Sequence, residues 1–247
     1  MIKKFILFSL IFFSVNVFAG TRDPSVSDDK YLEYGKQFKF VGQLEGSYKD
    51  GSMYMGSAVA IDDHHILTAA HIVKTSISAT FTIDKKKFVI RDIKYHKDFN
   101  PEKFGPGDIA LGYSSKSFEL EKYPELYTSD KEVNSECSMA GYGFTGTFET
   151  GAKNCDLKLR AGTNIIDEIK GDLLVCSASE TNKTKLEFLI ASGDSGGGLF
   201  IDGQLAGINS SVMTSDKNPN SSYNDESCHT RISSYIEWIN KYKSEDR

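Results

Sequence analysis

The sequence predicts an all-β fold of two barrel-like units closed by one C-terminal helix, and three observations carry this prediction. Short apolar or alternating runs, broken by Gly, Asp, Asn and Lys, recur along most of the chain, a texture typical of many short strands. A polar, charged segment that contains a proline, residues 114–133, separates two groups of such runs. Only the last segment, residues 232–243, has apolar side chains at helical spacing.

Each expected strand is a run rich in apolar, β-branched or aromatic residues, bounded by turn-forming residues. The strands are expected at residues 40–44, 53–61, 88–95, 109–113, 137–143, 156–166, 173–177, 199–201 and 205–212. The polar segment divides the chain into an N-terminal unit, residues 20–125, and a C-terminal unit, residues 126–247, which ends in the helix.

Residues 1–19 have the features of a secretory signal peptide, because Lys3 and Lys4 precede an apolar run that ends in Val17-Phe18-Ala19. The apolar run is too short to span a bilayer comfortably, since a spanning helix needs about 20 residues. Gly20, and not a cysteine, follows the expected cleavage point, so nothing indicates a lipid anchor. We therefore expect a protein exported to the periplasm or the cell exterior, without a membrane anchor.

The charge distribution argues against nucleic acid as a partner. The formal net charge is -5, and no run of lysine and arginine is dense enough to form a basic binding surface. We also expect no metal site, because no pair of cysteines or histidines stands at metal-ligand spacing. We expect the chain to act as a monomer.

The four cysteines, Cys137, Cys155, Cys176 and Cys228, all lie in the C-terminal half. Export would place them in an oxidising compartment, where cysteines pair as disulfides. Four cysteines allow three pairings, which sequence alone does not separate. We favour Cys137 with Cys155 and Cys176 with Cys228.

The stretch GDSGGGLF, residues 193–200, places Ser195 behind an aspartate and ahead of three glycines. A serine hydroxyl acts as a nucleophile only with a base from elsewhere in the chain. The stretch also fits the nucleophile elbow of α/β-hydrolases, in which a helix follows the serine and the acid and histidine come later. Here a strand, a turn and a strand are expected after Ser195, and only His229 lies beyond it, which argues against the elbow.

A histidine and an aspartate that suit Ser195 lie upstream of it. His71 directly follows the strand-like run HILTAA, and Asp108 stands at the head of another expected strand. The order His, Asp, Ser is one of three unrelated orders that build the same catalytic geometry. Taken together and in this order, the three residues predict a catalytic triad.

At these residues the sequence resembles the chymotrypsin and trypsin family of serine endopeptidases. The resemblance rests on TAAH at 68–71, GDIAL at 107–111 and GDSGG at 193–197, and it extends from about Phe40 to the C-terminal helix. It implies two six-stranded antiparallel β-barrels with the active site in the cleft between them. It also implies cleavage of protein or peptide substrates without a cofactor.

The resemblance assigns a role to each residue of the triad. His71, as a neutral imidazole, would take the Ser195 proton during attack on a carbonyl and return it to the leaving amine. Asp108 would hold the tautomer of His71. The backbone N–H groups of Gly193 and Ser195 would point at the developing oxyanion.

The family's primary specificity pocket maps onto Leu189 at its base, Val212 on its wall and Ser227 nearby. None of these is the aspartate that trypsin-like members use to bind Lys or Arg, so we expect no preference for basic residues. The edge strand that includes Ser210 and Val212 would hold an extended peptide by main-chain hydrogen bonds.

Two variants of this pocket remain open at this point. Glu187 would lie near the pocket if the alignment is shifted, because the segment TNKTKLEFLIAS, residues 181–192, is unusual for the family. Ser192 and His229 would help to bind an acidic side chain of the substrate in the other variant.

Asp194 has an activating role in the family, where proteolysis creates an N-terminal amine that pairs with this aspartate and shapes the oxyanion hole. This sequence departs from the family pattern, because no Ile-Val-Gly-Gly follows a basic residue between Gly20 and Lys30. Either an amine at Gly20, freed by signal cleavage, or one created after Arg22 pairs with Asp194, or another group supports it. We favour an amine.

We therefore expect a secreted serine endopeptidase. The alternatives are a non-catalytic binding protein on the same fold, since a fold does not prove an activity, and a serine esterase. Loss of a triad residue would favour the binding protein, and none is lost.

Overall fold

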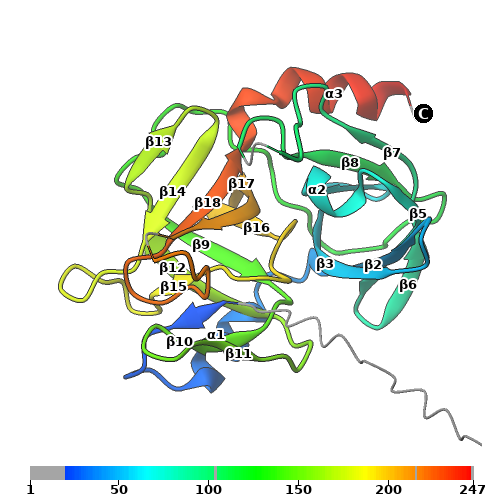
Figure 1. The fold of residues 1–247 in the computed structure, drawn as a ribbon. Helices are drawn as coiled ribbons and strands as arrows, with labels where there is room; N and C mark the ends of the chain where they lie inside the picture. Colours follow the sequence, from blue (N-terminus) through cyan, green and yellow to red (C-terminus); the bar gives the residue numbers. More distant parts are fainter. Residues whose placement is uncertain (1–19, 103–104, 215, 246–247) are drawn as a thin grey trace, which may run out of the picture.

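Two antiparallel sheets of seven strands each make up most of the protein, one from each half of the chain (Figure 1). The structure is a computed structural model that describes residues 20–102, 105–214 and 216–245. The expected signal peptide, residues 1–19, lies outside the described residues. In Figure 1 the two sheets stand side by side as barrel-like units, with the C-terminal helix above them.

The first sheet has the strand order β6-β5-β2-β3-β4-β8-β7. Its strands are β2 (Val41–Tyr48), β3 (Met53–Ala60), β4 (His65–Thr68), β5 (Ser76–Ile83), β6 (Lys86–Val89), β7 (Arg91–Tyr95) and β8 (Ala110–Tyr113). Apolar side chains from paired positions, such as Leu44 and Phe81, meet in its core and are fully buried. A one-turn helix, α2 (Ala70–Val73), follows β4 and carries His71.

The second sheet has the strand order β12-β9-β16-β17-β18-β14-β13. Its strands are β9 (Glu136–Gly141), β12 (Arg160–Ile165), β13 (Glu168–Lys170), β14 (Leu173–Ser177), β16 (Gly198–Ile201), β17 (Gln204–Met213) and β18 (Glu226–Arg231). Leu199 on β16 pairs with Met139 on β9, and both are fully buried. This core supports the chain segment that enters β16 from Ser195.

A small third sheet ties the start of the described chain to the second half. It has the order β11-β10-β1-β15, from β1 (Thr21–Arg22), β10 (Thr145–Thr147), β11 (Gly151–Asn154) and β15 (Phe188–Leu189). The helix α1 (Asp28–Gly35) then packs near β12, where a side chain at Gly35 would come within 2.8 Å of the Leu159 carbonyl oxygen. Residues 20–35, assigned to the N-terminal unit from the sequence, thus lie against strands of the second half.

The C-terminal segment crosses back to the first half of the chain. After the 3₁₀ turn η1 (Ile232–Ser234), the helix α3 (Ile236–Glu245) buries Ile239 in the same apolar cluster as the first sheet. The Tyr235 hydroxyl accepts a hydrogen bond of 2.8 Å from the N–H of Gly107, just before Asp108. Within the described ranges, no helix is long and apolar enough to cross a membrane.

The prediction of an all-β, two-barrel fold with a C-terminal helix is confirmed, whereas some individual elements were missed. Helix α1 escaped detection because only Tyr31 and Gly35 are buried along it, which leaves too short an apolar stripe. The strand β18 has the polar sequence ESCHTR, although Ser227 through Thr230 are buried. Hydrogen bonds between buried polar groups, which an apolar pattern does not reveal, take the place of apolar contacts there.

The expected disulfide pairs are wrong, because all four cysteines are free thiols. Cys137 is buried on β9, whereas Cys155 is exposed after β11. The register of β14 and β18 sets Cys176 opposite Ser227, one residue from Cys228, so the two side chains point to opposite faces of the sheet. Instead, the sulfurs of Cys137 and Cys176 lie 3.9 Å apart in the core.

Candidate active site

His71 and Asp108 form a hydrogen-bonded pair on the first unit. Asp108 Oδ2 lies 2.8 Å from His71 Nδ1, and Asp108 Oδ1 accepts the backbone N–H of His71 at 2.9 Å. The hydroxyl of Ser210, on β17 of the second unit, also donates to Asp108 Oδ2, at 2.6 Å. Three donors therefore fix the orientation of this carboxylate.

The environment of Asp108 keeps it ionised although it is only 1% exposed. Burial raises the pKa of this carboxyl, but the hydrogen bonds and electrostatic attraction of the His71 ring, together with the hydrogen bond from Ser210, outweigh burial. The pKa of Asp108 therefore lies below its ordinary value. An ionised carboxylate can only accept hydrogen bonds, so the contact of Asp108 Oδ2 with His71 Nδ1 favours the tautomer of His71 with its proton on Nδ1.

Ser195 lies in a tight turn between two glycines with positive φ, Gly193 at 88° and Gly196 at 84°. A β-carbon at Gly196 would come within 2.1 Å of both the Ser57 carbonyl oxygen and Thr68 Oγ1, so only glycine fits. Ser195 itself is partly exposed.

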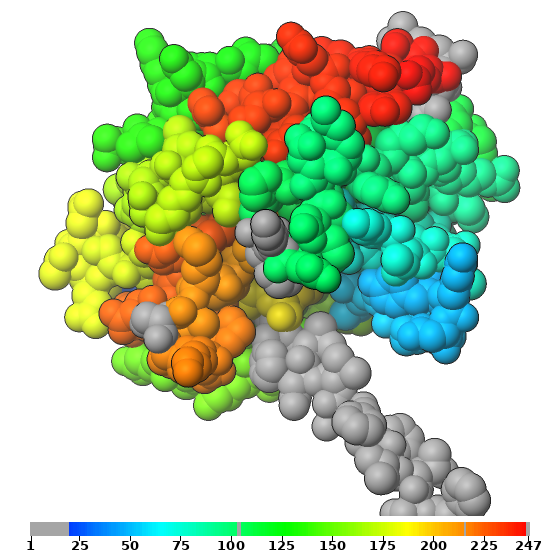
Figure 2. All heavy atoms as spheres, turned by 45° about the horizontal axis from the view of Figure 1, so that its top comes forward, coloured from blue at the N-terminus to red at the C-terminus, as the bar shows by residue number. Residues whose placement is uncertain are grey.

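The Ser195 turn packs directly against the segment that leads into His71. The backbone N–H of Ser57, on β3, donates to the Ser195 carbonyl oxygen at 2.8 Å. The same close approach at Gly196 sets the turn against Thr68 and Ala69, which come just before the helix of His71. In Figure 2, gold atoms of the segment around residue 195 are visible between the orange surface of the second unit and the blue and cyan surface of the first.

The backbone N–H groups of Gly193 and Ser195 are free to bind a ligand. In the described part of the chain, neither N–H donates a hydrogen bond to a protein acceptor. The carbonyl oxygen of Gly193 instead accepts the hydroxyl of Ser57 at 3.0 Å, which fixes the orientation of the residue. Sequence reasoning missed Ser57, because nothing in the pattern GSAVA marks its contact with a distant turn.

Asp194 points away from Ser195 into the interior, where three backbone N–H groups surround it. Oδ1 accepts the N–H of Gly143 at 2.9 Å, and Oδ2 accepts those of Ala191 at 3.1 Å and Gly20 at 2.7 Å. Burial raises the pKa of Asp194 to about 6, although these hydrogen bonds act to lower it. Gly20, the residue after the expected signal cleavage, is thus in direct contact with Asp194.

The residues expected to form the specificity pocket lie on neighbouring segments of the second unit. Leu189 on β15 is fully buried, and the next residue, Ile190, donates its N–H to Ser227 Oγ at 2.9 Å. Val212 on β17 pairs with Ser227 on β18 and is partly exposed. The part of β17 from Ser210 onward pairs only with β18 among the described strands, so its other edge is open.

Of the three residues in the two pocket variants, Glu187 and His229 are engaged elsewhere. The Glu187 carboxylate accepts the backbone N–H groups of Ser179 and Thr184 at 3.1 and 2.7 Å, so it anchors its own loop. His229 is fully buried on β18, whereas Ser192 is exposed. A fully buried imidazole is not accessible to a substrate side chain.

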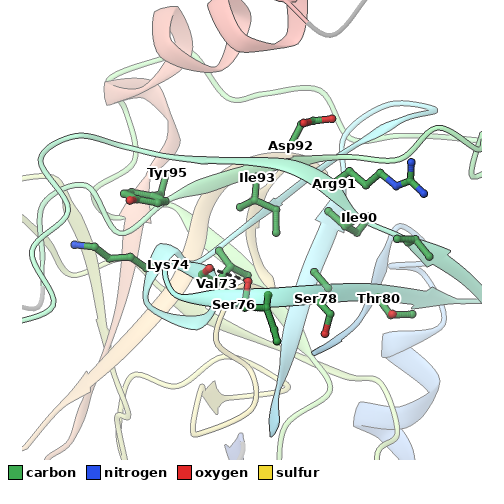
Figure 3. Close-up of a pocket in the computed structure, with 13 residues that line it drawn as sticks. Val73, Lys74, Ser76, Ser78, Thr80, Ile90, Arg91, Asp92, Ile93 and Tyr95 are labelled. Atoms are coloured by element: carbon green, nitrogen blue, oxygen red, sulfur yellow. Dashed lines mark hydrogen bonds between the residues drawn. The ribbon is translucent and has the colours of Figure 1, made fainter. Parts of the chain in front are cut away.

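A separate groove of about 600 Å³ lies between β5 and β7 (Figure 3). Its rim exposes Ile77, Val89 and Tyr95, three large apolar side chains that are 60%, 59% and 43% exposed. Ile90, the residue before β7, donates its N–H to the carbonyl oxygen of Ala79 on β5 at 2.9 Å. No residue of the Ser195 turn lines this groove, so it is distinct from the site described above.

Comparison with known proteins gives a consistent result. The profile of the Trypsin family matches residues 33–239. Mast cell protease 3 of Ovis aries is 28% identical over 209 residues, which cover 77% of this chain and 79% of that protein.

Two solved structures have a similar fold. A structure of HL collagenase superposes with a TM-score of 0.68 at 19% identity, covering 84% of this chain and 94% of that chain. Neuropsin, a serine protease expressed in the limbic system of mouse brain, gives a TM-score of 0.66 at 22% identity, covering 83% and 95%. The two structures support the fold alone, and with the profile match over most of the sequence the chain belongs to the trypsin family and is a serine endopeptidase.

Proposed function

We propose that this protein is an exported endopeptidase that cleaves peptide bonds through an acyl-enzyme, with His71, Asp108 and Ser195 as its triad. The observation that carries the proposal is that hydrogen bonds and close packing join the His71–Asp108 pair of the first unit to the second unit, which carries Ser195. Asp108 accepts hydrogen bonds from His71 and from Ser210 of the second unit, while the Ser195 turn packs on the segment leading into His71.

In this reaction Asp108 orients His71, His71 transfers protons and Ser195 attacks the substrate. Asp108 holds His71 with its proton on Nδ1, so that Nε2 accepts the Ser195 proton as Oγ attacks the carbonyl carbon. The tetrahedral intermediate collapses when His71 passes that proton to the leaving nitrogen, which breaks the peptide bond and leaves an ester on Ser195. Water, deprotonated by His71, then hydrolyses the ester and restores the serine hydroxyl.

The oxyanion of the intermediate would bind to the free N–H groups of Gly193 and Ser195. Fixed donors aimed at a developing negative charge supply a large share of the rate enhancement, since removal of one such donor costs about 10²–10³ in kcat. The hydrogen bond from Ser57 Oγ to the Gly193 carbonyl oxygen supports this role, because it holds the peptide unit that lies between the units carrying the two donors.

The proposal is tested by treating the purified mature protein with an active-site serine phosphonate and mapping the modified residue by peptide mass spectrometry. We expect labelling at Ser195 and at none of the other serines. Stoichiometric labelling of a different serine would contradict the triad, and absence of labelling would favour a non-catalytic protein on this fold.

We expect peptides with small or medium-sized apolar residues before the cleaved bond to be better substrates than peptides with Arg or Lys. The pocket residues Leu189, Val212 and Ser227 offer no carboxylate, and the nearby Glu187 is bonded to its own loop. An unpaired cation in such a pocket is costly, so kcat/KM for basic residues should be lower by about 10-fold or more. Profiling on a mixed peptide library measures this ratio, and a preference for Arg or Lys would show that the pocket assignment is wrong.

Export is the second part of the proposal. It rests on the signal-like sequence of residues 1–19 and on membership in a family whose members are commonly secreted. We propose a monomer without a membrane anchor, and expect protein or peptide substrates. Fractionation of cells that express the full-length chain, with N-terminal sequencing of the product, tests both export and cleavage before Gly20.

A further inference from the structure

We propose that Asn209, held in place by His229, is a positioning residue that fixes the Ser195 turn for catalysis. The inference rests on the proposed function, in which Ser195 is the nucleophile. Neither residue touches the reacting atoms, and both are fully buried behind the turn on β17 and β18.

The backbone of Asn209 holds the residues that follow Ser195. Its carbonyl oxygen accepts the N–H of Gly196 at 2.7 Å, and its own N–H donates to the Gly197 carbonyl oxygen at 2.9 Å. These two bonds attach the exit of the turn to β17. They do not depend on the side chain at position 209.

The side chain of Asn209 holds the residue before Ser195. Its Nδ2 donates to the carbonyl oxygen of Asp194 and to that of Ala140 on β9, each at 3.2 Å. The fit is close, because a β-carbon at Gly197 would come within 2.9 Å of Asn209 Nδ2. Asn209 therefore binds the chain on both sides of Ser195 and connects it to two strands.

His229 determines which way the Asn209 amide faces. The two residues pair across β17 and β18, and His229 Nδ1 lies 2.9 Å from Asn209 Oδ1. Since Nδ2 already faces two carbonyl oxygens, Oδ1 is the acceptor and His229 carries its proton on Nδ1. A flipped amide would set Oδ1 against those two oxygens, and the histidine opposes that flip.

The surroundings keep His229 in the neutral form that this contact uses. Burial lowers the pKa of His229 to about 3, so the ring is uncharged over the neutral range. Its Nε2 is buried and has no partner among the described residues, a position that tolerates a lone pair but not a second N–H. Nδ1–H is thus the single donor, and Asn209 receives it.

The same stretch of β17 also reaches the other half of the triad. A register shift between Asn209 and Ser211 leaves Ser210 between them, and Ser210 Oγ donates to Asp108 Oδ2. A displacement of Asn209 would therefore move the Ser195 turn relative to Asp108 and His71. Small displacements of this kind have large effects, since about 1 Å of misplacement can reduce a rate by about 10²-fold.

The test compares Asn209→Asp and His229→Leu with the wild-type protein. Asn209→Asp preserves the shape and the acceptor for His229 but removes both donors, whereas His229→Leu removes the donor to Oδ1. We expect kcat and the second-order rate of Ser195 phosphonylation to fall by about 10- to 100-fold in each, with KM within about 2-fold. His229→Asn places an amide N–H near the position of Nδ1, and we expect it to restore most of the rate.

A matched control separates positioning from stability. Leu174 on β14 pairs with His229 from the other side and is fully buried, so Leu174→Ala destabilises the same region without touching the turn. We expect Leu174→Ala to lower the midpoint of thermal unfolding yet label Ser195 at the wild-type rate when assayed well below that midpoint.

The outcomes separate a failure of the proposed function from a failure of the positioning role. If wild-type protein does not label at Ser195, the proposed function fails. If wild-type protein labels and Asn209→Asp and His229→Leu label equally fast, the positioning role is wrong. Loss of rate in Leu174→Ala equal to that in Asn209→Asp would also overturn it, as would a failure of His229→Asn to exceed His229→Leu.

Discussion

Replacement of His71 by alanine is expected to lower kcat/KM for peptide hydrolysis by about 10⁴-fold or more, because Ser195 loses the base that accepts its proton. Asp108→Asn is expected to cost about 10⁴-fold in kcat, since an amide at this position favours the wrong tautomer of His71. The Asp108 carboxylate accepts hydrogen bonds from both Nδ1 and the main-chain N–H of His71. Its substitution is therefore also expected to weaken the attachment of the helix that carries His71.

The measurement is the steady-state rate on a peptide substrate together with the rate of Ser195 phosphonylation. His64→Ala is the control variant, because His64 bonds to the Ser114 carbonyl oxygen at 2.9 Å in a turn outside the triad. We expect it to keep its activity within about 2-fold, because its hydrogen bond to Ser114 and its stacking on Tyr113 involve no residue of the triad. Undiminished phosphonylation in a folded His71→Ala protein would show that another group acts as the base.

The sequence was sufficient to predict the fold class and to select the residues that we propose for the triad. Short motifs around His71, Asp108 and Ser195 are local, and local chemistry such as a glycine at positive φ can be inferred from the residues themselves. Runs rich in apolar residues also predicted several strands, although β5 (Ser76–Ile83), which alternates buried and partly exposed residues at its end, was missed. These features have in common that the relevant residues are neighbours in the chain.

Features that depend on the register between paired strands could not be predicted from the sequence in the same way. The failed disulfide pairs show this, because the face on which Cys228 lies depends on its one-residue offset from Cys176 across two strands. Asn209 likewise looks like an ordinary polar residue in QLAGINSSVM until β17 is placed beside β18 and the Ser195 turn. Buried polar networks of this kind carry no periodic signal, since each member is satisfied by a partner remote in sequence.

The second prediction with a large expected effect concerns the amino terminus. A protein that retains residues before Gly20 is expected to be nearly inactive, and cleavage before Gly20 is expected to activate it. Gly20 N already lies 2.7 Å from Asp194 Oδ2, and cleavage would convert this peptide nitrogen into an ammonium group. Loss of a charge partner for a buried carboxylate costs about 3–5 kcal/mol, and Asp194 adjoins Ser195 in the turn.

The position of Gly20 favours this amine over one created after Arg22. A β-carbon at Gly20 would come within 2.0 Å of the Phe188 ring, so the space beside Asp194 fits a residue without a side chain. Thr21 and Arg22 then pair with strands on both sides. Cleavage after Arg22 would remove these three residues, and with them the strand that holds the terminus at Asp194.

The pH dependence follows from the sign of the expected shift. An ammonium group beside the Asp194 carboxylate is stabilised in its charged form, so its pKa rises above the reference value of about 8. A group whose pKa is raised in the folded state contributes its full stabilisation of that state at pH values below its reference pKa. This stabilisation is lost as the pH rises through the raised pKa. Activity of the mature form should therefore persist through neutral pH and fall reversibly above about pH 8.

The experiment uses one protein in two states. An N-terminal extension that ends in a site for a specific protease is placed before Gly20, and activity is measured before and after its removal, with mass spectrometry confirming each form. In the extended protein, the missing ammonium partner of Asp194 would destabilise the active conformation of the turn by about 3 kcal/mol. We therefore expect activity to rise by at least about 100-fold when the extension is removed. Full activity in the intact extended protein would rule out the amine, and would leave the N–H groups of Gly143, Ala191 and Gly20 as sufficient support for Asp194.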